Sequence, residues 1–386
     1  MERRGLDALI ATAPPNINYS SDIKHLNLTR SRIFVVLPKD DLKDSALLMP
    51  LGDIRDVVGT DHTWISDLRP SGNFYIYKEE NASLDGQARA IWDKVEAKRT
   101  DDISNLMQTL RDKGLTKKRI GLDESGLIKD AYEAIEGRIK SELNATVEGA
   151  FSAFREIRMV KTEEEVKRLR HCAQVTEEAI GVSLESAREG SSGDEIAATF
   201  MKKAWENGVT PRSEGIGLGE FAFLNNRQIP PPQILKKGDL IRFDVSCTYE
   251  SYYSDIARIG VLGEPNSQQK SYYEAVKAGA DAAIELIRPG VKASELFQAA
   301  VDGTRKAGLP TFDRSHCGHG IGLEMYDEPV IYPHNEAVLE KNMVINIENP
   351  FYSIGFGAAQ VEDTILVTDD GSEMLSTSDR NLRIIR

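Results

Sequence analysis

Four acidic residues and one histidine in the second half of the chain lie in short motifs that could hold metal ions. The motifs are FDVSCTYESYYSD with Asp244 and Asp255, GHGIGLEMYDEP with His319, MVINIENP with Glu348, and QVEDTILVT with Glu362. A carboxylate flanked by Val and Ile in a strand is costly to bury unless it is paired or bound to a metal. Four carboxylates and one imidazole suit two divalent cations, such as Mn, Co, Fe or Zn, that share ligands.

Each of these residues also has an ordinary structural explanation. The glycines around His319 can simply serve a tight backbone path. They can also let the backbone lie close to a bound ion while the imidazole acts as a ligand. Glu348 and Glu362 can be salt-bridge partners or residues of a solvated face. The presence of all five residues in one region favours the metal site.

The hairpin expected in FDVSCTYESYYSD determines how its two aspartates are spaced. Side chains alternate along a strand, so Asp244, Ser246 and Thr248 share a face. A chain reversal at Tyr249–Glu250 would place Asp244 directly opposite Asp255. Two like charges at that distance are destabilising unless a cation lies between them. The turn lacks the Asn-Gly sequence that usually specifies such a hairpin.

The elements that position these residues fall into two regions. In the first, the strand-like runs DALIAT, RIFVVL, SALLMP and RIGLDES alternate with the helical runs SLDGQARAIWDKVEAK and ISNLMQTLRDKGL, which predicts an α/β domain. Thr162 and Glu165 then form a capping-box pattern that opens a long helix reaching to Gly190. We therefore expect a domain of residues 1–155 and a second domain of residues 156–386.

The second region combines strands and helices in a different order. LIRFDVSCTY, YYSDIARIGVLG, MVINIE and AAQVEDTILVT are strand-like, and QQKSYYEAVKAGADAAIELI and KASELFQAAVDGTRKAG are helical. Consecutive strands, then helices, then further strands predict an α+β domain in which helices back an antiparallel sheet.

Composition excludes several classes of protein. The 386 residues carry a net charge of -13, which argues against a nucleic-acid partner because phosphate binding needs clustered Lys and Arg. Apolar runs are too short for a membrane span or a secretory signal. The three cysteines form no C-x-x-C pair, which fits a reducing compartment. We expect a cytoplasmic protein with neither a nucleic-acid nor a membrane partner.

In their order and separations, the four motifs resemble the metal-site motifs of the family that contains prolidase, aminopeptidase P, methionine aminopeptidase and creatinase. This resemblance covers residues from about 160 to 386. GLDALIATAPPNINYSSDI is similar to the opening of the family's N-terminal creatinase/prolidase-type domain. The resemblance implies a pita-bread catalytic domain with a curved antiparallel sheet, preceded by an α/β N-terminal domain. It also implies a homodimer.

The resemblance implies a role for each of the five residues. Asp244 would chelate one metal, Asp255 and Glu362 would bridge two metals, and His319 and Glu348 would hold the other. Manganese is the first expectation, with cobalt, zinc or iron as alternatives. A hydroxide bridging the two ions would attack the scissile carbonyl. Glu348, beside that water, is the candidate general base.

Several positions depart from the family pattern. Arg227 and Tyr326 stand where histidines are usual, and so does Ser315. His316 lies next to that position and could partly substitute, although adjacent side chains on an extended backbone point to opposite faces. Gln360 stands where the prolidase-like pattern has arginine.

Two of these residues are candidates for contacting the substrate. Tyr326 can donate a hydrogen bond to an oxyanion, and Arg227 can clamp a carboxylate. Each also has a plainer explanation, since Tyr326 can be an aromatic of the pocket wall and Arg227 a surface cation. The metal centre is therefore expected to be retained, whereas the residues facing the substrate are altered.

These patterns predict a dinuclear-metal hydrolase of the prolidase or aminopeptidase P type. Its substrate would be a small molecule with an amide bond to proline or a related imino nitrogen. One alternative is a family member that acts on a non-peptide, as a lyase or hydrolase of an osmolyte-like compound. The other is a binding protein without catalysis, against which the five intact ligand positions argue.

Overall fold

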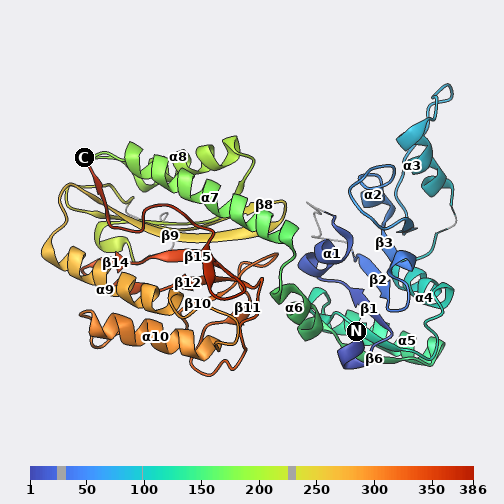
Figure 1. Cartoon of the computed structure of the whole chain (residues 1–386). Helices are drawn as coiled ribbons and strands as arrows, with labels where there is room; N and C mark the ends of the chain where they lie inside the picture. The colour runs from blue at the N-terminus through green and yellow to red at the C-terminus, as the bar shows by residue number, and fades with distance from the viewer. Residues whose placement is uncertain (24–31, 98, 225–231) are drawn as a thin grey trace. The chain divides into compact units, whose positions relative to one another are not determined.

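The computed structural model describes residues 1–23, 32–97, 99–224 and 232–386, and the chain forms two compact units (Figure 1). The first unit is Met1–Glu156 and the second is Ile157–Arg386. Helix α6 (Phe151–Met159) runs across this division. Each unit has hydrophobic clusters of its own.

The first unit is built on a mixed sheet with the strand order β4-β3-β2-β1-β5-β6. Its strands are β1 (Ala8–Ala11), β2 (Phe34–Pro38), β3 (Ala46–Pro50), β4 (Asp67–Ser71), β5 (Arg119–Leu122) and β6 (Thr146–Gly149). Its other helices are α1 (Pro14–Ser21), α2 (Leu51–Ile54), α3 (Gly86–Glu96), α4 (Asp102–Asp112) and α5 (Lys129–Leu143).

Both faces of this first sheet are covered, which explains its continuous apolar strands. Ile10 and Val36 pack on one face with residues of α4 and α5. Leu9 and Val35 pack on the other face with residues of α1 and α6. A strand buried on both sides needs apolar residues at every position, as the runs in β1 and β2 have. The expected α/β class is therefore confirmed for this unit.

The second unit contains a nine-stranded sheet whose main path is β11-β10-β12-β15-β9-β8-β7, with β16 beside β15 and β17 beside β9. The path strands are β7 (Thr210–Leu218), β8 (Leu240–Tyr249), β9 (Tyr252–Leu262), β10 (Gly318–Gly320), β11 (Asp327–Val330), β12 (Val344–Glu348) and β15 (Glu362–Val367). The remaining strands are β13 (Phe351–Ser353), β14 (Gly357–Ala359), β16 (Ser372–Met374) and β17 (Arg383–Ile385).

Two helix pairs pack on this sheet, and in Figure 1 one pair lies above its strands and the other below them. They are α7 (Glu163–Ser186) with α8 (Gly193–Glu206), and α9 (Ser267–Ile284) with α10 (Ala293–Lys306). Thr162 and Glu165 form the expected capping box at the start of α7, but the helix ends at Ser186 rather than reaching Gly190. Among the described helices, none combines the length and apolar character needed to cross a bilayer.

The alternation of side chains leaves one sheet face polar. On β8, Ile241, Phe243 and Val245 pack in the cluster under α7 and α8. The residues between them, among them Asp244 and Ser246, therefore point to the opposite face, as the spacing predicts. The curved antiparallel sheet of an α+β domain is thus present, and the part of this face around Asp244 carries polar side chains, while Tyr273 of α9 packs on Leu240 and Ile259 farther along the same face.

The expected register of the β8–β9 hairpin is wrong by two residues. Asp244 pairs with Ala257, and Asp255 pairs with Ser246. The reversal lies at Glu250–Ser251, whose φ angles of 46° and 73° are both positive. Such a two-residue turn matches the twist of its strands, although neither residue is Asn or Gly. The two aspartates are thus diagonal neighbours on one face instead of direct partners.

A buried ion network fixes the backbone of the two strands that carry Asp255 and Glu362. Arg258 on β9 donates from Nη2 to Glu177 Oε1 of α7 at 2.6 Å and to Asp363 Oδ1 at 2.7 Å. Its Nη1 donates to the backbone oxygen of Glu362 at 2.6 Å. The side chains of Arg258, Glu177 and Asp363 are at most 3% exposed.

Replacing Glu177 with Gln is expected to lower the free energy of unfolding by about 3 kcal/mol, because it removes one partner of a buried charge. Urea denaturation measures this loss. Glu178→Gln is the matched control, since Glu178 is 54% exposed and pairs with Lys203. Such a surface pair contributes under about 1 kcal/mol. Equal losses in the two variants would show that the network does not stabilise the sheet.

Candidate metal centre

Three of the predicted carboxylates lie in one row across four neighbouring strands. Asp244 on β8 pairs with Ala257 on β9, Ala257 pairs with Glu362 on β15, and Glu362 pairs with Glu348 on β12. Residues that are directly opposite in an antiparallel pair point to the same face. Only the methyl group of Ala257 stands between Asp244 and Glu362 in this row.

The other two predicted ligands lie in the adjacent row of the same face. Asp255 precedes Ala257 by two residues, so the two side chains point the same way. His319 on β10 pairs with Asn346, which precedes Glu348 by two residues on β12. The sheet therefore carries all five predicted residues on one face.

Glycines bring the histidine strand close to its neighbours. A Cβ atom at Gly318 would lie 2.0 Å from the backbone oxygen of Asn346, and one at Gly320 would lie 2.0 Å from that of Glu328. Gly318 also has φ of 139°, which side chains rarely adopt. The plain explanation of these glycines is thus correct, and the tight path is also what presents His319 to the carboxylates.

His319 is buried with its Nε2 atom facing two carboxylates. Nε2 lies 3.9 Å from Asp255 Oδ2 and 3.8 Å from Glu362 Oε1, and it has no hydrogen-bond partner within the described ranges. Nδ1 lies 2.9 Å from the backbone oxygen of Gly320. One ligand atom from each of these three side chains lies within 4.8 Å of the others. This arrangement suits a metal-binding imidazole whose second nitrogen is held by a carbonyl.

The carboxylates of this centre repel one another. Burial raises the pKa of Asp255 well above its usual value, and the charges of Asp244 and Glu348 raise it further. Burial likewise raises the pKa of Glu362, with Asp255 as the next cause. Burial lowers the pKa of His319, which favours the neutral imidazole that can bind a cation. A divalent ion would relieve this repulsion, so the donor set fits such an ion.

Asn346 joins the two bridging candidates. Its Nδ2 donates to Glu362 Oε1 at 3.0 Å and to the backbone oxygen of Asp255 at 2.8 Å. This amide fixes the orientation of the Glu362 carboxylate against β9. Hydrogen bonds of this kind orient ligand groups before a metal binds.

Glu348 is surrounded by groups that keep it ionised. Burial pushes its pKa upward, but a hydrogen bond from His316 and electrostatic interactions with His319, His316 and Arg314 outweigh burial, so the pKa of Glu348 is lowered. His316 Nε2 lies 3.0 Å from Glu348 Oε1. Tyr326 donates to the same oxygen at 3.3 Å. A carboxylate that is ionised near neutral pH can serve as a ligand or accept a proton.

Tyr326 and His316 both lie at the centre. The Tyr326 ring stacks on His319 with centroids 3.8 Å apart, and its hydroxyl lies 3.3 Å from His316 Nε2. Side-chain alternation would point His316 away from the site, but this residue precedes β10 and is not in a strand. The Ser315 hydroxyl lies 3.0 Å from His316 Nδ1, the ring nitrogen that does not face Glu348. The remaining predicted residue, Arg227, lies outside the described residues.

Besides Asn346, three residues of the site were not singled out from the sequence. Arg242 contacts Asp244, and Tyr352 on β13 accepts a hydrogen bond from Arg242 Nη2 at 2.9 Å. Arg314 lies with Nη2 3.9 Å from Glu348 Oε2 and its guanidinium 5.8 Å from the Tyr352 ring centre. Arg242 could have been found by counting two residues back from Asp244 in the apolar run LIRFDVS. Tyr352 and Arg314 have no comparable signal, because they lie on other segments.

The sequence profile of metallopeptidase family M24 matches residues 167–369. This chain belongs to metallopeptidase family M24. The predicted kinship with the prolidase, aminopeptidase P and creatinase group is confirmed. The match contains all four metal motifs and therefore the whole row of carboxylates.

A curated M24 relative, an Xaa-Pro dipeptidase of Pyrococcus horikoshii, is 32% identical over 229 residues. The match covers 59% of this chain and 65% of the relative, so this chain spans just under two thirds of that protein's length.

Two solved M24-type structures have the same fold. The X-Pro aminopeptidase from Thermotoga maritima MSB8 superposes with a TM-score of 0.78 at 22% identity, covering 100% of this chain and 99% of that chain. The prolidase from Pyrococcus horikoshii OT3 superposes with a TM-score of 0.77 at 24% identity, covering 99% and 97%. The pita-bread fold expected from the motifs is confirmed.

Proposed function

We propose that this chain is a dinuclear-metal hydrolase that cleaves an amide bond to proline in a small peptide. The observation that carries the proposal is the buried Nε2 atom of His319, which faces Asp255 and Glu362 without a hydrogen-bond partner in the described part of the chain. Such an atom beside two carboxylates of raised pKa is best explained by a bound cation. The names of the relatives, which include Xaa-Pro dipeptidases, support proline-containing substrates.

The proposed ligand set keeps the roles expected from the motifs. Asp244 would hold one cation, Asp255 and Glu362 would be shared, and His319 with Glu348 would hold the other. When bound, two divalent cations lower the pKa of a shared water molecule and polarise the scissile carbonyl. Manganese is the first candidate, because the set is rich in oxygen, and cobalt, zinc and iron are alternatives.

The residues around Glu348 supply the remaining functions. Glu348 would accept the proton that the attacking water molecule gives up and pass it to the leaving nitrogen of the substrate. Tyr326 and His316, which both contact the Glu348 carboxylate, keep it oriented, and Tyr326 can donate to developing negative charge. The partly buried Arg314 and the half-exposed Tyr352 ring line the same side of the centre. Arg227 remains a candidate for contacting the substrate.

Other parts of the proposal rest on resemblance and composition. The first unit is proposed to be the creatinase/prolidase-type domain, with the division at residues 155 and 156 that the sequence suggests. We propose a homodimer that works in the cytoplasm on small molecules, without nucleic acid or membrane as partners. The net charge of -13 supports the absence of a nucleic-acid partner.

A substrate panel tests the activity. Protein loaded with Mn²⁺ is expected to hydrolyse at least one class among Xaa-Pro dipeptides and longer Xaa-Pro peptides, measured as released amino acid. Small betaines and cyclic amides in the same panel test the alternative non-peptide chemistry. The absence of turnover with every proline substrate, in protein shown to contain two equivalents of Mn²⁺, would contradict the peptidase proposal. Less than one equivalent of any tested metal would contradict both enzyme proposals.

A further inference from the structure

A fully buried arginine lies beside the candidate metal centre. Arg242 is on the same face of β8 as Asp244, and its side chain is 0% exposed. Burying a guanidinium is costly unless its charge is paired and its donors are used. Its contacts meet both needs, and among the described residues they include the Asp244 carboxylate, Gln360 Oε1 at 2.7 Å, the backbone oxygen of Ala222 at 3.3 Å and the Tyr352 hydroxyl at 2.9 Å.

The contact between Arg242 and Gln360 explains one departure from the family pattern. Gln360 occupies the position where the prolidase-like motif has arginine, two residues before Glu362. In this chain the Gln360 amide instead accepts a hydrogen bond from Arg242 Nε. The guanidinium beside the carboxylates is therefore supplied by β8, and the residue at position 360 helps to hold it.

Arg242 constrains Asp244 in two ways. Its Nη2 donates a hydrogen bond to Oδ2 of Asp244, so the carboxylate cannot rotate freely. The other oxygen, Oδ1, is thereby turned away from Arg242. Its positive charge also offsets part of the negative charge of the carboxylates. The Tyr352 ring lies 5.0 Å from the guanidinium carbon and limits its movement from the other side.

We propose that Arg242 is a positioning residue of the metal centre, which fixes Asp244 for cation binding and is itself held by Gln360 and Tyr352. The inference rests on the proposed function, because it takes Asp244 to be a ligand.

Calorimetric titration of Mn²⁺ into metal-free protein tests this role. Arg242→Met is expected to weaken the binding of one of two Mn²⁺ ions by about tenfold or more, as the loss of a residue that orients a metal ligand typically does. The double variant Arg242→Met/Gln360→Arg is expected to regain most of this affinity, because a guanidinium returns from the neighbouring position. The Mn²⁺ affinity of Arg242→Lys should lie between those of wild type and Arg242→Met, since an ammonium keeps the charge but not the planar set of donors.

Controls separate positioning from general stability. Arg288→Met removes an exposed cation and is expected to leave Mn²⁺ affinity unchanged. The melting temperature of each metal-free variant is measured in parallel, and a lower melting temperature with wild-type affinity would overturn the inference. If Arg242→Met does not fold, Tyr352→Phe decides the question, because it removes only the hydroxyl that Arg242 contacts. It should weaken Mn²⁺ binding by a smaller factor, and unchanged affinity would overturn the inference.

The outcomes also distinguish this inference from the proposed function. Wild-type protein that binds no Mn²⁺ contradicts the proposed function and the inference with it. Wild-type protein that binds two Mn²⁺ ions, with equal affinity in Arg242→Met, contradicts the inference alone.

Discussion

Glu348→Gln protein is expected to lose about a thousandfold or more in kcat while it folds normally. An amide of the same shape can still contact His316 and Tyr326, but it cannot accept a proton at neutral pH, and general acid–base catalysis accounts for effects of this size. The wild-type carboxylate is ionised because the His316 hydrogen bond and nearby cationic groups outweigh burial and lower its pKa. Turnover of a proline dipeptide by Mn²⁺-loaded protein measures the loss.

Two controls make this result specific. Glu340→Gln makes the same chemical change at an exposed position of the same unit and should leave kcat unchanged. The metal content of Glu348→Gln distinguishes loss of the base from loss of a ligand, because a pure base defect leaves two equivalents of Mn²⁺ bound. Wild-type kcat in Glu348→Gln would refute the assigned role.

Removal of metal is expected to lower the melting temperature of the protein by about 5 to 10 °C at pH 8 and to abolish activity. A ligand present at a hundred times its dissociation constant stabilises the folded state by about 2.7 kcal/mol, and about 1 kcal/mol shifts the melting temperature of a unit of this size by about 2 to 4 °C. Scanning calorimetry with chelator, and then with added Mn²⁺, measures the change in melting temperature.

The loss of stability without metal should also depend on pH. Burial and mutual repulsion raise the folded-state pKa of Asp255 and Glu362. Above the usual carboxylate pKa the unfolded chain releases these protons while the folded, metal-free protein retains them. Stability should therefore fall as pH rises from the usual pKa to the raised pKa, by about 1.4 kcal/mol per carboxyl group for each pH unit between these two values. Bound metal replaces these protons, so loaded protein should not show this fall.

The Asp255→Asn/Glu362→Gln variant is the control for the pH effect. Its amides carry no charge at any pH, so the metal-free variant should melt at a higher temperature than metal-free wild type at pH 8. Added Mn²⁺ should no longer stabilise it. If the melting temperatures of the two metal-free proteins change equally with pH between pH 5 and pH 8.5, the proposed repulsion is contradicted.

Much of this architecture could be predicted from the sequence, because strand alternation and motif order are local properties. The shared face of Asp244 and Ser246 follows from period two alone, and the capping box of Thr162 and Glu165 is readable from their spacing of three residues. The common face of all five predicted ligands needed the family resemblance, since strands β8, β10, β12 and β15 meet only through long-range pairing.

The rest depended on features that the sequence does not display. The hairpin register follows from positive φ angles at Glu250 and Ser251, which are not the residues usually found in such turns. An ion pair from Arg168 to Glu250, at 3.0 Å, joins α7 to this turn. No local sequence pattern predicts this ion pair. His316 points at Glu348 because it precedes its strand, so alternation was the wrong rule there.

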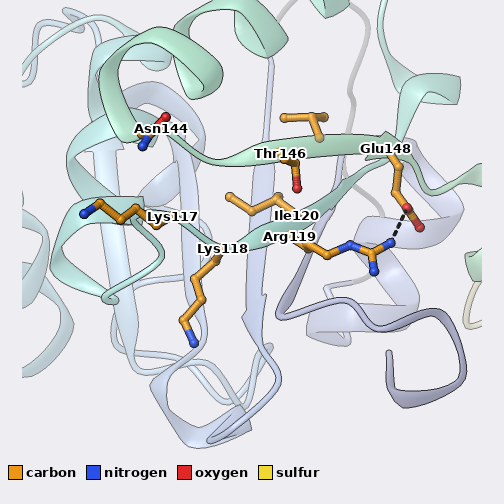
Figure 2. A pocket seen from close by; sticks show the side chains of 8 residues that line it. Lys117, Lys118, Arg119, Ile120, Asn144, Thr146 and Glu148 are labelled. Carbon is orange, nitrogen blue, oxygen red and sulfur yellow. Dashed lines mark hydrogen bonds and ion pairs between the residues drawn. The ribbon is translucent and has the colours of Figure 1, made fainter.

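The first unit contains a cavity, but a cavity alone does not indicate function. A cavity of about 430 Å³ lies along β5 and β6 (Figure 2) and is lined in part by Lys117, Lys118 and Arg119. Arg119 is paired with Glu148 at 3.1 Å, and Lys118 lies 3.9 Å from Asp7. Two of these cations therefore already have acidic neighbours. None of the described residues that line this cavity has a buried side-chain atom without a hydrogen-bond partner, as His319 has in the second unit.

The row of donors across β8, β9, β15 and β12 has a consequence for how the protein matures. Asp244 and Glu362 reach the same row only when β8, β9 and β15 have paired, and unfolded chains rarely preform such a site. A nascent or truncated polypeptide that stops before Glu362 would lack a shared carboxylate. Metal uptake should therefore be the last step in the maturation of this protein. Bound metal would then distinguish fully folded molecules from incomplete ones.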